Sequence, residues 1–278
     1  MTLTRRQATE LLEAYGAAPS RALGQNFVVD PNTVRRIARL AQVGAGDRVV
    51  EIGPGLGSLT RALAETGASI VALELDRFVL PILVQEVVPL GVRVVEGDAM
   101  NADWPELLQG EPHVLVANLP YNISVPLICD LLDQQPLIGR MLVMVQKEVG
   151  ERLAGRPRTK AYGGVSVKVA YWGTARIVGH VPPTVFLPQP KVDSALVSIV
   201  RHDQPAVDPS IVSHADLFEL VQTGFGKRRK MLRGSLAELV VADDFAAAGV
   251  APEARPEELD VHAWGRLAAA RKGRISHA

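Results

Sequence analysis

The chain contains 278 residues, of which 47% are hydrophobic and 22% are charged, a composition that excludes extensive disorder and allows one large core with a small second domain. Its 30 Lys and Arg residues balance 30 Asp and Glu residues, so the overall charge does not indicate a nucleic-acid partner and must be considered locally. The single cysteine excludes an internal disulfide, no apolar run is long enough to cross a bilayer and no secretory signal is recognisable, so we expect a soluble protein of the cytoplasm.

The first half of the chain predicts two helices followed by alternating strands and helices. Residues 5–15 form an amphipathic pattern, and Asp30 with Pro31 is typical of a helix start, since Asp is a favoured N-cap and Pro a favoured first helical residue. Strands are then expected at residues 47–52, 69–73, 92–95, 114–117 and 140–146. This alternation predicts an α/β fold with a parallel sheet covered on both faces.

The second half predicts the end of the sheet and a separate helical region. Residues 175–181 and 194–200 are expected as a late hairpin whose strands are separated by a proline-rich loop at 182–190. Residues 203–209 have the composition of a linker, and residues 214–273 show only helical patterns. The sequence therefore predicts two domains, residues 1–201 and 210–278.

A glycine-rich turn follows the strand at 47–52. Gly53-Pro54-Gly55-Leu56-Gly57 leads directly into a helix that opens at Ser58, and backbone without side chains can approach a ligand closely there. A dinucleotide fingerprint has the spacing G-x-G-x-x-G, whereas here Ser58 stands where the third glycine would fall. A pyrophosphate cradle is therefore disfavoured, and a smaller ligand such as S-adenosylmethionine is favoured.

Carboxylates follow the next two predicted strands. Glu74 lies at about the spacing at which a carboxylate meets ribose hydroxyls, and Asp98 can accept a hydrogen bond from an adenine amine. Each of them alone is equally compatible with a cap or a loop carboxylate. Three successive strand ends that carry glycines, Glu74 and Asp98 in this order favour a nucleoside site.

The most informative stretch is Asn118-Leu119-Pro120-Tyr121, directly after the apolar run 114–117. It combines an amide, a restricted backbone and an aromatic ring, which together can hold a flat heterocycle and accept hydrogen bonds from its exocyclic amine. Alone, so short a motif is also compatible with a strand-to-loop turn and a packed tyrosine. Its place among the other strand ends favours an adenine-binding site.

Basic residues cluster in two further segments, and each cluster alone is more typical of a solvated face. Lysine and arginine side chains contribute affinity for phosphate without sequence information. If the two clusters face the same way, a folded nucleic acid would be the substrate, and the sequence leaves that point open. The candidate RNA-binding residues are Arg156, Arg158, Lys160, Lys227, Arg228, Arg229, Lys230 and Arg233.

With these residues in view, the chain resembles the small-subunit (16S) ribosomal RNA adenine N6,N6-dimethyltransferases between about Leu23 and Leu236. The shared blocks are Gly24–Phe27, Glu51–Gly57, Glu74–Asp76, Gly97–Ala99, Asn118–Ser124, Gln146–Val149, Phe186–Ala195 and Phe225–Lys230. Val28 and Met231 depart from the usual leucine and threonine of the family. These two differences affect details of the cofactor pocket and of RNA contact.

The resemblance implies a Rossmann-like class I methyltransferase core with a small C-terminal all-helical domain, and S-adenosylmethionine as cofactor. We expect the cofactor to contact Gln25, Asn26, Val28, Glu51, Gly53, Gly55, Glu74, Asp98, Ala99 and Asn118. The catalytic residues would be Asn118, Leu119, Pro120, Tyr121 and Phe186, with Tyr121 and Phe186 stacking on the two faces of the base. The implied substrate is a pair of adjacent adenines in the 3′-terminal hairpin loop of 16S rRNA, presented on an immature 30S subunit to a monomeric enzyme.

Other functions remain open at this stage. A macrolide-resistance methylase of 23S rRNA shares the fold and the Asn-x-Pro-Tyr motif, but Pro188–Val192 and Lys227–Lys230 favour the small-subunit type. A DNA adenine methyltransferase would typically carry two prolines where Leu119-Pro120 stands. A non-catalytic ribosome-assembly factor is the alternative outside the enzymes. The histidines show no metal-binding spacing such as H-E-x-x-H, and we expect no metal.

Overall fold

The computed structural model describes residues 2–276 and divides into two compact units. The first unit comprises the chain up to Gly150 together with Arg176–Val200, and the second comprises Glu151–Ala175 together with the chain from Arg201 onward. The outer ends of the predicted domains, residues 1 and 278, lie outside the described residues. No helix within residues 2–276 is both long and apolar enough to span a membrane.

A seven-stranded sheet forms the centre of the first unit, with the strand order β4-β3-β2-β5-β6-β9-β7. The five strands from β4 to β6 run parallel, and β9 pairs antiparallel with β6. The strands are β2 (Arg48–Ile52), β3 (Ser69–Glu74), β4 (Arg93–Glu96), β5 (His113–Asn118), β6 (Ile138–Gln146), β7 (Gly173–Val181) and β9 (Ser194–Arg201). The predicted parallel sheet and its late additional strands are therefore present, with β9 inserted between β6 and β7.

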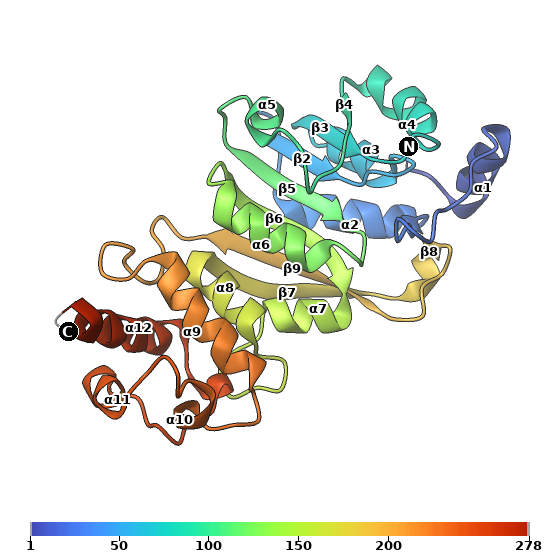
Figure 1. Ribbon diagram of the computed structural model, residues 1–278. Helices are drawn as coiled ribbons and strands as arrows, with labels where there is room; N and C mark the ends of the chain where they lie inside the picture. Colours follow the sequence, from blue (N-terminus) through green and yellow to red (C-terminus); the bar gives the residue numbers. More distant parts are fainter. Residues whose placement is uncertain (1, 277–278) are drawn as a thin grey trace. The chain divides into compact units, whose positions relative to one another are not determined.

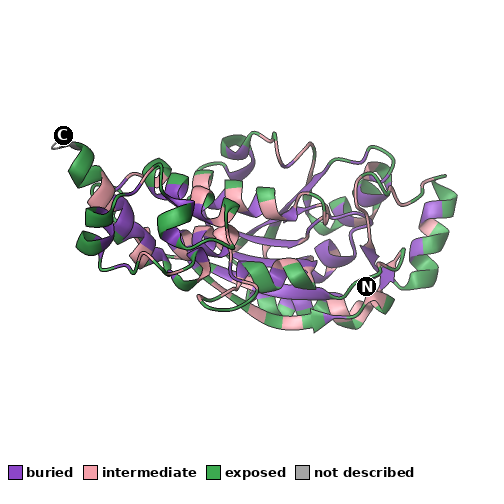
Figure 2. Ribbon diagram, turned by 60° about the horizontal axis from the view of Figure 1, so that its bottom comes forward, coloured by how far each residue is buried: buried purple, intermediate pink, exposed green. Residues whose placement is uncertain are grey.

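Helices cover both faces of this sheet, because alternate strand residues point to opposite sides. Helices α2 (Pro31–Ala41), α3 (Ser58–Ala64) and α4 (Leu80–Val87) contribute to one core together with Val49, Val116 and Leu142 of the strands. On the other face lies α6 (Ser124–Gln134), and Figure 1 shows it in front of the strands with α2 and α3 behind them. Figure 2 shows the central strands buried along most of their length, whereas most residues of the edge strands β4 and β7 are intermediate or exposed. Two further short helices of this unit are η1 (Val88–Leu90) and α5 (Trp104–Leu108), and α7 (Lys147–Leu153) begins in this unit and ends in the second.

The N-terminal region forms the two helices that the sequence predicts, α1 (Arg5–Ala14) and α2, the latter with Asp30 as N-cap and Pro31 in its first turn. An additional short strand, β1 (Phe27–Val28), lies between them and pairs antiparallel with β8 (Phe186–Leu187). The proline-rich loop predicted at 182–190 therefore contains a strand and the 3-10 turn η2 (Pro183–Val185). Two-residue strands carry no periodic pattern, so the sequence gives no local signal for them.

The second unit is helical apart from the strand ends that it shares with the sheet. Its helices are α8 (Gly164–Trp172), α9 (His214–Gly226), α10 (Leu232–Ser235), α11 (Ala242–Ala248), η3 (Pro256–Glu258) and α12 (Val261–Ser276). Trp264 is fully buried at its centre. The boundary predicted from the sequence assigns Glu151–Ala175 to the first domain, whereas the contacts group this segment with the C-terminal residues. The physical reason is that Tyr162, Val167 and Tyr171 pack in the core of the second unit.

Candidate active site

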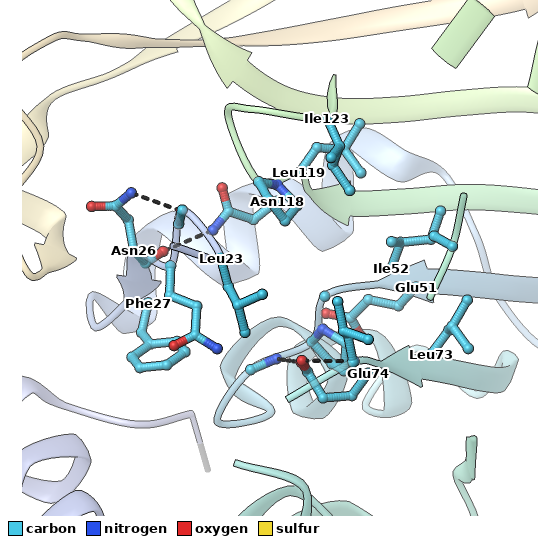
Figure 3. A pocket seen from close by; sticks show the side chains of 18 of the residues that line it. Leu23, Asn26, Phe27, Glu51, Ile52, Leu73, Glu74, Asn118, Leu119 and Ile123 are labelled. Carbon is cyan, nitrogen blue, oxygen red and sulfur yellow. Dashed lines mark hydrogen bonds between the residues drawn. The ribbon is translucent and has the colours of Figure 1, made fainter. Parts of the chain in front are cut away.

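A cavity lies at the carboxyl ends of the parallel strands β2, β3, β4 and β5, where open α/β sheets bind their ligands. The segment Leu23–Val28, which precedes α2, provides another side of the cavity. Figure 3 shows Asn118, Glu51 and Glu74 arranged around it. All ten residues predicted to bind the cofactor line this cavity, as do Leu119, Pro120 and Tyr121.

The glycine turn between β2 and α3 requires its glycines. Gly53, Gly55 and Gly57 have φ angles of +64°, +58° and +80°, in the left-handed region that other residues rarely adopt. At Gly55 a Cβ atom would also lie 2.7 Å from the ring of Phe27. The turn can therefore hold its conformation and pack against the N-terminal segment only with glycine at that position.

Glu74 ties the end of β3 to this turn. Its Oε2 accepts a hydrogen bond from the backbone N–H of Gly55 (2.9 Å), and its Oε1 accepts from the N–H groups of Leu75 (3.0 Å) and Asp76 (2.9 Å). Burial raises the pKa of Glu74 above its usual value, although these backbone donors act in the opposite direction. The carboxyl group thus shapes the cavity wall in addition to lining it.

Glu51 at the end of β2 is the most perturbed acid of the site. It is 1% exposed, and its Oε2 has no hydrogen-bond partner among the described residues. Burial, with a smaller contribution from the neighbouring Glu74 charge, raises the pKa of Glu51 to about 8. Because a buried polar oxygen without a partner is costly, this side chain is suited to a ligand that donates a hydrogen bond or carries positive charge.

Asp98, after β4, is half-buried and organises the loop that follows it. Its Oδ1 accepts from the N–H of Met100 (3.0 Å), and its Oδ2 accepts from the Asn101 amide (2.8 Å). Each carboxylate oxygen has two lone pairs and accepts one of these bonds, so each can still accept a hydrogen bond from a ligand. The loop-carboxylate interpretation and the ligand-contact interpretation are thus compatible here.

The lining has a strongly one-sided charge. Glu51, Glu74 and Asp98 line the cavity, and no Lys, Arg or His occurs among the described residues of its wall. Acidic groups that line one cavity favour a ligand that brings positive charge, because such a ligand stabilises their ionised forms. A dianionic pyrophosphate would meet no cation here, which agrees with the interpretation of the glycine spacing.

The Asn118 side chain has a defined orientation at the end of β5. Its Nδ2 donates to the backbone carbonyl of Asn26 at 2.9 Å, so its Oδ1 is left as an acceptor at the cavity (Figure 3). The next residue is fixed as well, because the N–H of Leu119 donates to the carbonyl of Met144 (3.1 Å). The site therefore offers the side-chain oxygen of Asn118 next to a backbone that is held in place at Leu119.

The two predicted stacking residues are placed differently. Tyr121 is half-buried at the cavity, its hydroxyl lies 2.9 Å from the Ser194 hydroxyl, and burial raises the pKa of its phenol. Phe186 does not line the cavity: it is fully buried on β8, opposite Val28 of β1. In this conformation Tyr121 alone of the pair presents a ring to a ligand.

Several lining residues were not predicted from the sequence. They are mostly apolar and comprise Leu23, Phe27, Ile52, Leu73, Leu75, Met100 and Ile123. Leu73 and Leu75 flank Glu74, and Ile52 follows Glu51, so adjacency to a predicted ligand residue was the available signal. Phe27 has the same signal, because it lies between Asn26 and Val28, but its contact with the glycine turn depends on the tertiary fold.

The candidate RNA-binding residues all lie in the second unit. Arg228 is half-buried, and the other seven are exposed. Arg228 donates to the Lys160 carbonyl (3.1 Å) and lies 3.5 Å from Glu257, whose own carbonyl accepts from the Arg158 N–H (2.7 Å). Parts of the two basic segments, which are separate in sequence, thus meet within this unit. Lys227 and Arg233 pair with Glu238 and Glu253 at 4.0 and 3.3 Å.

Within residues 2–276, no group of three or more His, Cys, Asp or Glu side chains is arranged to hold a metal ion. The Glu51, Glu74 and Asp98 carboxyl groups line one cavity but do not form such a group. The features that characterise the site are its acidic side chains, its glycine turn and the Asn118 oxygen as a hydrogen-bond acceptor.

Comparison with known proteins identifies the family. Residues 19–270 match the family model described as ribosomal RNA adenine dimethylase. The chain belongs to this family. The ribosomal RNA small subunit methyltransferase A of Cutibacterium acnes is 45% identical, with 96% of this chain and 94% of that protein covered. The protein of the same name from Leifsonia xyli is 46% identical, with 94% and 95% covered.

Solved structures agree with this assignment at the level of fold. The 23S rRNA methyltransferase ErmE has a TM-score of 0.70 at 27% identity, over 89% of this chain and all of that chain. A dimethyladenosine transferase from Plasmodium falciparum has a TM-score of 0.73 over 86% and 94%, and at 24% identity this likeness shows the fold alone. The family resemblance and the Rossmann-like α/β core predicted from the sequence are both confirmed.

Proposed function

We propose that this dimethylase family member transfers methyl groups from S-adenosylmethionine to N6 of two adjacent adenines in the 3′-terminal hairpin loop of 16S rRNA, giving N6,N6-dimethyladenosines. The observation that carries the proposal is the fixed Asn118 amide, whose oxygen faces a cavity with three carboxyl groups. The match of relatives named small subunit methyltransferase over more than nine-tenths of the chain supports the 16S substrate. The likeness to ErmE makes 23S rRNA the alternative to be tested.

The residues of the cavity fit S-adenosylmethionine. When bound, this cofactor supplies an electrophilic methyl group on a positively charged sulfonium. The acidic wall suits that charge, and the unpartnered Oε2 of Glu51 suits a cationic amine. We assign Glu74 to the ribose hydroxyls and Asp98 to the adenine amine of the cofactor, while the turn at Gly53–Gly57 lets the backbone approach it closely.

The chain acts on the target base mainly by positioning. The exocyclic amine of adenine is a weak nucleophile, since its lone pair is delocalised into the ring. If the Asn118 Oδ1 and the Leu119 carbonyl accept hydrogen bonds from the two N–H groups of this amine, its nitrogen becomes more pyramidal. The lone pair of the nitrogen then points away from both acceptors. Methylation leaves the nitrogen with an excess proton, which lies against these same oxygens before passing to water. No strong base is required, so the rate gain is one of orientation.

Tyr121 holds the base in this arrangement. Its ring lines the cavity, and its hydroxyl is anchored 2.9 Å from that of Ser194. Stacking contributes about 1–3 kcal/mol per base, comparable with the few kcal/mol needed to extrude a base from its stack. We retain Phe186 as the second stacking residue, which requires that β8 move from the position in which its ring is buried.

We further propose that the protein acts as a monomer in the cytoplasm, on an immature 30S subunit. The basic residues of the second unit would contact RNA phosphates there, and Arg229, Lys230 and Lys160 are among the exposed ones. Such contacts position the particle without reading its sequence. The choice of adenines then depends on the cavity in the first unit.

The test is incubation with tritiated S-adenosylmethionine and either unmethylated 30S or 50S particles, followed by nucleoside analysis. Dimethyladenosine formed on 30S alone is the expected result. Label on 50S alone would move the assignment to the 23S methylases. No label on either particle, with binding to 30S retained, would show a non-catalytic assembly factor instead.

A further inference from the structure

We propose that Gln25 and Asp76 are positioning residues for methyl transfer: their hydrogen bond holds the N-terminal segment so that the Asn26 carbonyl orients the catalytic Asn118 amide. The expected effect on the rate of methyl transfer rests on the proposed function. The structural part of the inference, the orientation of Asn118, can be tested without any substrate.

The first link joins two segments that are 51 residues apart in sequence. The Nε2 of Gln25 donates to Oδ2 of Asp76 at 2.7 Å, and its Oε1 accepts from the backbone N–H of Ser20, also at 2.7 Å. The other oxygen of Asp76 accepts from the N–H of Phe78 (2.9 Å). Both side chains therefore have assigned donors and acceptors, and Asp76 is 6% exposed, so water does not compete freely for its bond.

The second link passes from this bond to the reacting group. The residue after Gln25 is Asn26, whose carbonyl accepts from Asn118 Nδ2 at 2.9 Å. The Asn26 side chain folds back and donates to the Gly24 carbonyl (3.1 Å), so it stabilises its own segment. A displacement of Gln25 would therefore move, one residue on, the atom that holds Asn118.

The orientation of Asn118 depends on this carbonyl for a physical reason. The terminal torsion of an asparagine is broad and roughly two-fold, so the side chain itself does not decide which of its two atoms faces the cavity. The Asn26 carbonyl decides it, because it can only accept and thus attracts the NH₂ group. A flipped amide would point a donor at the target amine, where an acceptor is needed.

Asp76 does not line the cavity, which separates it from the groups that touch ligand. Gln25 lines the cavity, but both of its amide atoms are engaged with Ser20 and Asp76. The pair therefore acts through Asn118 and the segment that holds it. Misplacement of a reacting group by about 1 Å can lower a rate on the order of 100-fold, so a bond this far from the chemistry can still affect kcat.

The hydrogen bond can be broken and rebuilt with isosteric changes. Gln25→Glu places an oxygen against Asp76 Oδ2 while keeping the acceptor for Ser20. Asp76→Asn places an NH₂ group against that of Gln25 while keeping the acceptor for Phe78. In the double variant the donor and acceptor are exchanged, and one hydrogen bond forms again at the same place. Gln134→Glu, at an exposed position of α6, is the control for the added charge.

Two measurements are made on all five proteins. The first is kcat for methylation of 30S particles, with the Kd of S-adenosylmethionine measured in parallel. We expect each single change to lower kcat about tenfold to 150-fold, the range for a lost hydrogen bond to a charged group, with a much smaller change in Kd. The double variant should recover to within about threefold of the wild type. Gln134→Glu should match the wild type.

The second measurement is the ¹H–¹⁵N side-chain amide signal of Asn118 in the ligand-free protein, assigned by its loss in Asn118→Ala. One of its protons should be hydrogen-bonded and slow to exchange in the wild type, lose that protection in both single variants and regain it in the double variant. Protection unchanged in the single variants would overturn the inference. A double variant in which the losses of kcat from the two single changes simply add would overturn it as well. A wild type that methylates no particle would refute the proposed function, while the amide signal would still decide the orienting role.

Discussion

Glu51 gives the sharpest test of the acidic cavity, because its buried carboxyl predicts how the stability of the ligand-free protein depends on pH. Burial raises the pKa of Glu51 from the ordinary value of 4.5 to about 8. Between these pH values the unfolded chain has lost this proton, whereas the folded protein keeps it. The folded state therefore binds more protons, and the contribution of Glu51 to stability falls as pH rises.

The magnitude follows from the size of the shift. Each pH unit between the two pKa values lowers the free energy of unfolding by about 1.4 kcal/mol. From pH 6 to pH 8 the total is about 2 kcal/mol, since the folded-state group is half titrated at the upper end. Glu51→Gln removes the titration and with it this slope. The free energy of unfolding of the variant, relative to that of the wild type, should therefore rise by about 2 kcal/mol between pH 6 and pH 8.

The assay is urea unfolding of the ligand-free protein at pH 6, 7 and 8. A difference in the free energy of unfolding that is the same at every pH reflects how well the glutamine amide fits. Only a change of that difference with pH reports the titration of the Glu51 carboxyl group. Glu111→Gln is the matched control, because that side chain is exposed and its carboxylate lies 3.2 Å from Arg48. A difference between wild type and Glu51→Gln that is equal at pH 6 and pH 8 would refute the reasoning.

Three further outcomes follow from the site. Asn118→Ala should lower the single-turnover rate roughly 100-fold or more, as for other lost transition-state hydrogen bonds, with unchanged 30S binding in a filter assay; a rate near that of the wild type would contradict the mechanism. Glu74→Ala should weaken S-adenosylmethionine about tenfold to 150-fold by calorimetry, and an unchanged Kd would remove this residue from the site. Tyr121→Phe and Ser194→Ala should each lower activity about two- to tenfold, and the double variant should lose no more than either, since the hydroxyls share one bond; additive losses would show that they act separately.

Local patterns in the sequence were sufficient for the sheet and for the ligand positions at its strand ends. The strands β2, β3 and β5 are apolar runs bounded by turn residues, and each carries at its carboxyl end a residue that lines the cavity: Glu51, Glu74 or Asn118. In a parallel sheet the carboxyl ends of the strands share one edge, so strand order along the chain already brings these residues together. The cavity could thus be predicted before its apolar lining was known.

Contacts between distant segments could not be predicted in the same way. Asn26 and Asn118 are 92 residues apart, and nothing in either segment indicates that a backbone carbonyl of one orients the amide of the other. The pairing of Phe27 with Leu187 involves strands too short to show alternation. The burial of Phe186 follows from that pairing, which is why the sequence predicted the residue type of a stacking partner but not its position in this conformation.

In the proposed mechanism, the amide at position 118 has to satisfy two groups at once. The Asn26 carbonyl can only accept a hydrogen bond, and an adenine amine presents N–H donors, so the side chain between them must donate on one side and accept on the other. An ionised aspartate of the same shape only accepts, and it would repel the Asn26 carbonyl. It would also add a fourth acidic side chain to Glu51, Glu74 and Asp98, which already line the cavity. Asparagine can satisfy both neighbours and is neutral, so in the proposed mechanism its acceptor for the amine does not depend on the charge of the acidic groups around it.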